Sequence, residues 1–178
     1  MVVTGFVAGI ATPFLAKQGG RWILAGAFLV LVTVASDQIY PKMVARLGEP
    51  SRRSRVFVPL AARLVEMAWL YGLWKLGVPA GVVVAAGGLT LMHEYVRARG
   101  QIAGLKDIGI VTLGERSMRG WIALGGYSMA GIVALTSTVY SPGMVTGIVT
   151  IATTAWLLLG VLGFVQLAIV VSAAFRSK

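Results

Sequence analysis

The chain is poor in the groups on which most enzyme chemistry depends. Its 178 residues include no cysteine, a single histidine and only six Asp or Glu residues. The absence of cysteine excludes disulfides, thiolate metal sites and a cysteine nucleophile. Only 12% of the residues are charged, whereas a soluble domain has about 25%. A water-soluble core inside a polar shell is therefore excluded, and we expect lipid to surround most of the chain.

Positive charge is the one polar feature present in excess. The chain has 16 Lys or Arg residues and a formal net charge of +10. They form short clusters between apolar runs, without the interleaved aromatic side chains that a base-stacking surface needs. The charge therefore predicts a membrane topology and no nucleic-acid partner.

Long apolar runs account for the rest of the sequence, in which 57% of the residues are hydrophobic. These runs do not alternate as barrel strands would, so helices are the only spanning structure that satisfies the backbone in lipid. Most are close to the roughly 20 residues that cross a bilayer, the first being short and the last long. We predict one all-α integral membrane domain, residues 1–178, with six transmembrane helices. The expected spans are 2–16, 22–40, 56–76, 78–96, 120–140 and 143–175.

The distribution of basic residues predicts the orientation of these spans. Segments 41–55 and 97–119 contain five basic residues each, and the C-terminal tail contains two. The alternate loops contain only Lys17, Arg21 and Lys75. By the positive-inside rule, both termini and the two long loops are expected on the cytoplasmic side.

The junction between the second and third expected spans contains a recognisable frame. It begins at Asp37, continues through an Ala45-Arg46 pair and includes Pro59-Leu60-Ala61. This frame resembles the signature of the CDP-alcohol phosphatidyltransferases, D-x2-D-G-x2-A-R-x8-G-x3-D-x3-D. When the signature is aligned without gaps from Asp37, its other three acids fall on Tyr40, Val58 and Ala62.

The missing acids bear directly on catalysis. The resemblance implies transfer of a phosphatidyl group from a CDP-lipid, which needs a divalent cation held by several carboxylates. Val58 and Ala62 cannot ligate a metal or accept a proton. We therefore predict no metal site, no cofactor and no catalytic residue in this chain, and Mg²⁺ or Mn²⁺ only if other acids rebuild the site. Of those acids, Glu66 is expected to pair with Arg63 inside the membrane.

A second segment, from His93 to Arg119, carries the runs His93–Arg99 and Gly114–Arg119. It resembles the branch of the family that makes phosphatidylinositol-phosphate-type lipids, where basic residues line a pocket for the acceptor phosphate. Guanidinium groups bind phosphate oxygens bidentately. The expected phosphate-binding residues are Arg46, Arg97, Arg99, Arg116 and Arg119.

The role of these arginines has alternatives. They could set topology and meet anionic head groups, or pair with Glu115 to anchor the loop. Because few carboxylates are available, we expect a cavity of net positive charge that takes a phosphate, sulfate or anionic head group. His93 lies beside Glu94 at the end of the fourth span. It could act as a general base, but we expect a helix-dipole and interface role.

The resemblance leads to one leading hypothesis and two alternatives. The leading hypothesis is a catalytically degenerate homologue in phospholipid biosynthesis, serving as a non-catalytic partner or regulatory subunit of an active paralogue. The family commonly forms dimers, so a homodimer or a heterodimer in a prokaryotic cytoplasmic membrane is expected, with CDP-lipid as a candidate ligand. The alternatives are an active transferase, using CDP-lipid and an alcohol phosphate at a rebuilt site, and a non-catalytic membrane protein that binds anionic lipid or phosphate.

Overall fold

The computed structural model describes residues 2–48, 51–105, 113–136 and 142–176, and these form an all-helical bundle. Each expected span corresponds to one helix, although several helices extend past the apolar run into charged residues. The six helices of the described residues are α1 (Val2–Ala16), α2 (Arg21–Leu47), α3 (Arg52–Lys75), α4 (Ala80–Ile102), α5 (Arg116–Thr136) and α6 (Pro142–Arg176).

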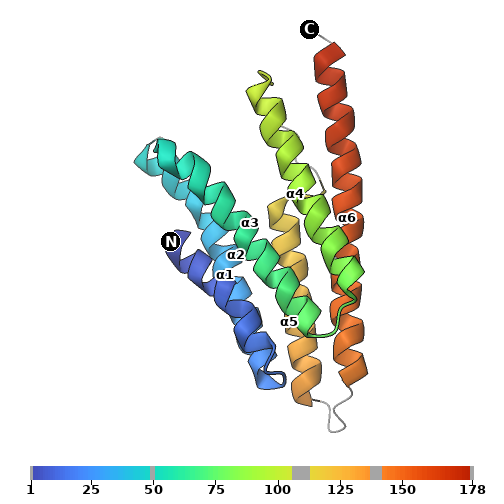
Figure 1. The fold of residues 1–178 in the computed structure, drawn as a ribbon. Helices are drawn as coiled ribbons and strands as arrows, with labels where there is room; N and C mark the ends of the chain where they lie inside the picture. The colour runs from blue at the N-terminus through green and yellow to red at the C-terminus, as the bar shows by residue number, and fades with distance from the viewer. Residues whose placement is uncertain (1, 49–50, 106–112, 137–141, 177–178) are drawn as a thin grey trace.

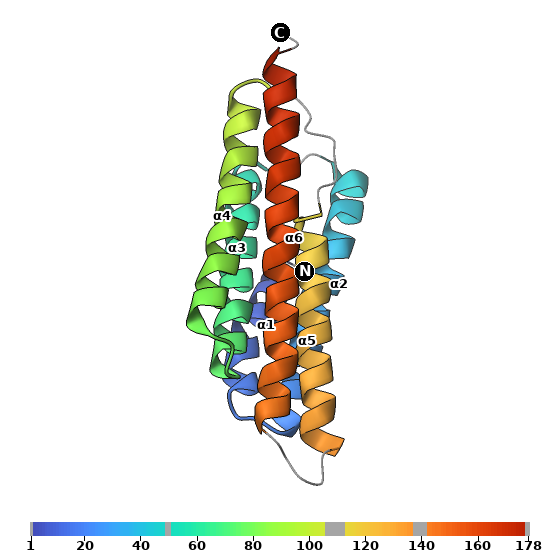
Figure 2. The same cartoon turned by 90° about the vertical axis from the view of Figure 1, so that its right-hand side faces the viewer.

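The helices run up and down beside one another (Figures 1 and 2). The α1–α2 and α3–α4 connections lie at the lower end of Figure 1, and the C-terminal end of α6 lies at the upper end. α1 packs on α2 and α3, and α6 packs on α4 and α5. The contact of α2 with α5 joins these two groups of three helices, whereas α3 and α4 diverge toward the upper end of Figure 1.

Large aromatic side chains fill the centre of the bundle. Trp69, Tyr127 and Trp156 are almost completely buried. The hydroxyl of Tyr127 donates a hydrogen bond of 2.7 Å to the carbonyl of Trp69, and the Trp156 indole donates one of 3.1 Å to Thr90. These bonds satisfy polar atoms that would otherwise be costly in an apolar interior. Glycine permits the closest approach, because a Cβ at Gly72 would collide with the Tyr127 hydroxyl.

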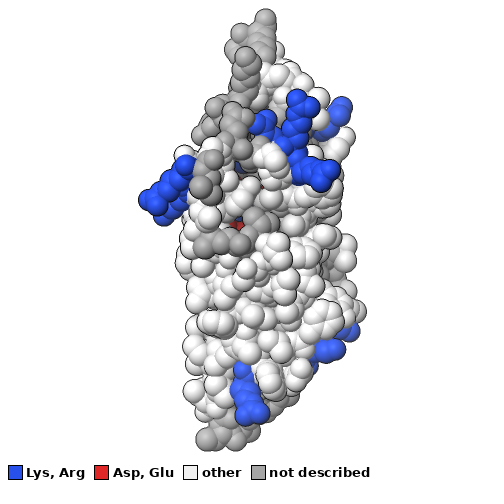
Figure 3. Space-filling view, turned by 90° about the vertical axis from the view of Figure 1, so that its left-hand side faces the viewer, with Lys and Arg blue, Asp and Glu red and all other residues white. Residues whose placement is uncertain are grey.

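The outer surface is suited to lipid. The helical segments Arg21–Arg46, Arg52–Lys75 and Gly143–Arg176 are long and apolar enough to cross a membrane, and α1 is a shorter apolar helix. Figure 3 shows Lys and Arg gathered near one end and, in smaller number, near the other, with a broad band free of charge between them. The membrane prediction is supported in this coarser form. Six spans and their orientation stay predictions.

Candidate functional site

A cavity of about 460 Å³ lies toward the upper end of the bundle, where α3 and α4 diverge. Residues from α1 to α5 line it, together with Glu115, which precedes α5. All four positions that the resemblance assigns to acids line this cavity: Asp37, Tyr40, Val58 and Ala62. Positions up to 25 residues apart in the sequence therefore meet around one space, and only one of them carries a carboxylate.

The facing ends of α2 and α3 bring these positions together. α2 ends at Leu47 and is capped by Gly48, whose φ of 98° falls in the region that favours glycine. α3 begins after Ser51, whose hydroxyl accepts a hydrogen bond of 3.2 Å from the Ser54 amide as an N-cap. The two helices run antiparallel (Figure 1), and Asp37 in the second half of α2 lies on the same cavity as Val58 near the start of α3.

Asp37 is bound by an arginine from α5. Nε and Nη2 of Arg116 each donate a hydrogen bond of 2.8 Å to one of the two carboxylate oxygens of Asp37. This bidentate arrangement is the strongest that a guanidinium makes with a carboxylate. The resemblance assigned Asp37 to a metal and Arg116 to a phosphate, and the structure instead pairs the two with each other.

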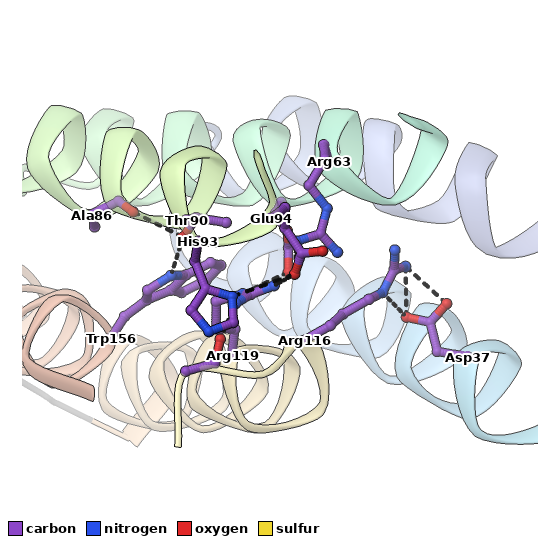
Figure 4. Close-up of polar contacts among 11 residues, drawn as sticks. Asp37, Arg63, Ala86, Thr90, His93, Glu94, Arg116, Arg119 and Trp156 are labelled. Carbon is purple, nitrogen blue, oxygen red and sulfur yellow. Dashed lines mark hydrogen bonds and ion pairs between the residues drawn. The ribbon is translucent and has the colours of Figure 1, made fainter. Parts of the chain in front are cut away.

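A second group of charges lies deeper, between α3, α4 and α5 (Figure 4). Nε of Arg119 donates to Glu66 at 2.8 Å, and its Nη2 donates to Glu94 at 3.3 Å. Arg119 also donates to the carbonyl of Gly114. Arg63 approaches Glu66 at 2.9 Å and Glu94 at 3.0 Å. The predicted Arg63–Glu66 pair is confirmed, and it belongs to a network of two arginines and two glutamates that balances its own charge.

The remaining predicted phosphate ligands are divided between the cavity and the surface. Arg97 lines the cavity and pairs with Glu115 at 3.1 Å. Arg46 and Arg99 are exposed on the outer surface and do not line the cavity. The structure therefore does not gather the five arginines around one anion site.

The expectation of a positively charged cavity is wrong. Its lining includes three arginines and three carboxylates, and each of these arginines contacts one of the carboxylates. The lining arginines are Arg63, Arg97 and Arg116, and the carboxylates are Asp37, Glu94 and Glu115. The sequence did not reveal this balance because Glu94 and Glu115 lie far along the chain from Asp37 and fall outside the acid signature.

The expectation that His93 lies at a helix end, with a helix-dipole and interface role, is also wrong. α4 continues past it to Ile102, so His93 is not at a helix C-terminus. Its side chain is 2% exposed, and Nδ1 lies 3.9 Å from a carboxylate oxygen of Glu94. The helix extends because Arg97 and Arg99 are good helix formers, although they end the apolar run. His93 is therefore an interior residue next to the ion-pair network.

The donor atoms of the cavity do not fit a divalent cation. Such an ion needs several carboxylate oxygens directed at one point, but each cavity carboxylate faces a guanidinium. In the part of the chain that the structure describes, no group of three or more His, Cys, Asp or Glu residues is placed to hold a metal.

No protein-family model, curated protein or solved structure matches this chain. Its function is therefore inferred from the residues and their geometry.

Proposed function

We propose that the chain is a membrane protein of the CDP-alcohol phosphatidyltransferase type that has lost its metal site and serves as a non-catalytic partner of an active relative. The observation that carries this proposal is the double hydrogen bond between Arg116 and Asp37. Asp37 is the only acid at the four signature positions, and its two oxygens are already engaged. The other three positions offer a phenol, an isopropyl and a methyl group.

The electrostatics of this pair explain why it opposes catalysis. A divalent cation that approached Asp37 would meet the guanidinium of Arg116 at the same oxygens. Repulsion between like charges and loss of the existing ion pair would both weaken the cation's binding. Arg116 is therefore a permanent counter-ion for Asp37, and this end of the bundle holds together without a metal.

The membrane arrangement in this proposal is six spans with both termini in the cytoplasm. Its support is the distribution of basic residues along an up-and-down bundle. Lys17, Arg21 and Lys75 fall near the connections at one end. The basic residues of the segments 41–55 and 97–119 that the structure describes fall toward the other end. By the positive-inside rule, the cavity then opens on the cytoplasmic side.

A role as a partner subunit follows from what the chain keeps and what it has lost. It keeps the helical bundle, the cavity and a buried ion-pair network. It lacks the carboxylates that the chemistry needs. An ancestral symmetric dimer becomes a mixed dimer when one of two duplicated chains loses its site. The phosphate-binding alternative has less support, because Arg97 and Arg116 already pair with carboxylates.

Two measurements test the proposal. Purified protein, given a CDP-lipid, an alcohol phosphate and Mg²⁺ or Mn²⁺, should release no CMP above a protein-free control. Isolation of the tagged chain from its native membrane should bring with it a phosphatidyltransferase that carries all four signature acids. Release of CMP that is abolished by Asp37→Asn would instead establish the active alternative with a rebuilt site.

A further inference from the structure

The cavity is large enough to hold part of a lipid. Its volume of about 460 Å³ lies in the range of roughly 300–1,000 Å³ that is usual for small-molecule sites. Space-filling Figure 3 shows a hollow in the outer surface with acidic atoms visible at its bottom. The charged groups toward this end are therefore reachable from outside and are not sealed within the bundle.

The lining of the cavity has two chemically different parts. Phe6, Val34, Val58, Pro59 and Val65 contribute apolar surface from α1, α2 and α3. The three ion pairs contribute the charged surface. An occupant that satisfies both parts has a polar head group and an apolar portion beside it, which describes an amphiphile.

In two of the three ion pairs that line this cavity, the carboxylate side chain has the larger exposed fraction. The side chain of Asp37 is 35% exposed and that of its partner Arg116 is 23% exposed. The contrast is larger for Glu94, which is 31% exposed beside an Arg63 that is 14% exposed. In the third pair the exposures are nearly equal, 22% for Glu115 and 25% for Arg97. An occupant of the cavity can therefore reach hydrogen-bond acceptors as well as donors.

From this arrangement we infer that the cavity binds a lipid whose head group carries a primary ammonium. Unlike a divalent cation, an ammonium does not have to displace the arginines, because its three N–H donors can use the lone pairs of Asp37 and Glu94 that the arginines leave unused. An anionic phosphate head group without an ammonium would face these carboxylates and repel them. A zwitterionic aminophospholipid adds no net charge to a cavity whose own charges cancel. The inference does not depend on a catalytic partner, so it stands apart from the proposed function.

The experiment compares three head groups, which carry a primary ammonium, a quaternary ammonium and no nitrogen. The detergent-purified chain is mixed with equal amounts of phosphatidylethanolamine, phosphatidylcholine and phosphatidylglycerol with identical acyl chains. Native mass spectrometry then counts the lipids retained. Phosphatidylethanolamine should be retained about tenfold better than phosphatidylcholine, because only its ammonium can donate N–H hydrogen bonds to the carboxylates. A long-chain primary amine in a separate arm shows whether the ammonium alone is recognised or the phosphate contributes as well.

Two substitutions on α3 locate the site. Val58→Phe places a ring in the cavity and should reduce retention of phosphatidylethanolamine about tenfold, the whole of the preference. Val56→Phe makes the same change at a side chain that is 63% exposed and does not line the cavity, so it should leave retention unchanged. The double variant Asp37→Asn with Arg116→Gln removes the charges as a pair without filling the cavity, and it should bring phosphatidylethanolamine and phosphatidylcholine close to equal retention.

Several results would overturn the inference. Equal retention of the three phospholipids by the wild-type chain would show that the head-group nitrogen is not read. Unchanged retention in a Val58→Phe protein that melts like the wild type would place the lipid elsewhere. If Val58→Phe does not fold, the double variant decides, and a preserved preference for phosphatidylethanolamine there would also count against the site.

Discussion

Arg116 and Asp37 are 79 residues apart in the chain, and two hydrogen bonds of 2.8 Å join them at the cavity. The pair fastens the beginning of α5 to the second half of α2. A positive charge that is part of the protein lies where the resemblance would place a metal. The ion pair therefore has two effects. It stabilises the upper end of the bundle, and it engages Asp37, the only acid left at the four signature positions.

Restoring the signature should recover metal binding only when Arg116 is also replaced. The lost positions are restored by Tyr40→Asp, Pro41→Gly, Val58→Asp and Ala62→Asp. This fourfold variant still has Asp37 held by Arg116, so we expect weak Mn²⁺ binding by isothermal titration calorimetry. Adding Arg116→Gln should tighten binding at least about tenfold, since removal of one adjacent positive charge is worth 1.4 kcal/mol or more. Equal affinity of the two variants would show that the pair does not block the cation.

The control for this experiment is Arg97→Gln in the same fourfold background. Arg97 also lines the cavity, but the carboxylate that it pairs with is Glu115, at 3.1 Å. The substitution Arg97→Gln should therefore improve the affinity of the fourfold variant for Mn²⁺ much less than Arg116→Gln does. A similar gain from both would mean that general cavity charge, and not the Asp37 pair, opposes the ion.

Removal of Arg119 should destabilise the protein strongly. Arg119 is 2% exposed, and Glu66, which it contacts at 2.8 Å, is fully buried. Arg119→Met leaves Glu66 with Arg63 as its remaining counter-charge, and breaking a buried pair costs about 3–5 kcal/mol. Adding Glu66→Gln to Arg119→Met should restore part of the lost stability, because the buried negative charge is then removed as well. Unfolding of the three proteins by SDS in mixed micelles measures the difference, and a single variant as stable as the wild type would contradict a supporting role for the network.

Two glycines of α6 offer a matched pair for testing helix packing. A Cβ at Gly163 would collide with the backbone of Gly114, whose carbonyl accepts a hydrogen bond from Arg119. Gly163→Ala should therefore destabilise the bundle by about 1–3 kcal/mol. A Cβ at Gly147 would meet no atom within 4 Å, so Gly147→Ala should be neutral or slightly stabilising through its better helix propensity. Thermal unfolding in detergent should separate the two, and equal melting temperatures would argue against the close contact.

Orientation can be tested in a chain that contains no cysteine of its own. Arg53→Cys and Gln18→Cys introduce single exposed thiols near opposite ends of the bundle. A membrane-impermeant maleimide added to intact cells should label position 18 and spare position 53 until the cells are opened, because the positive-inside rule places the latter in the cytoplasm. Labelling of both positions in intact cells would contradict the proposed orientation.

The sequence predicted the helices better than it predicted their ends. Apolar runs identified the centre of every helix, because period and length are visible locally. The ends were missed where charged residues continue a helix, as at Ile102 of α4 and Arg116 of α5. The Arg63–Glu66 pair was predictable since the two residues are three apart on one helix. The pairing of Asp37 with Arg116 had no such signal, because it depends on how α2 packs against α5.

The unequal lengths of α1 and α6 have a consequence for the surrounding bilayer. α1 has 15 residues and α6 has 35, which correspond to about 22 Å and about 52 Å at 1.5 Å per residue. The hydrocarbon layer is about 30 Å thick. If both helices cross it, lipid beside α1 must thin locally, while α6 must tilt or extend its last turns into water. The bilayer around the protein would then be thinner beside α1 than beside α6. The thinner side favours neighbouring membrane proteins whose hydrophobic spans are equally short.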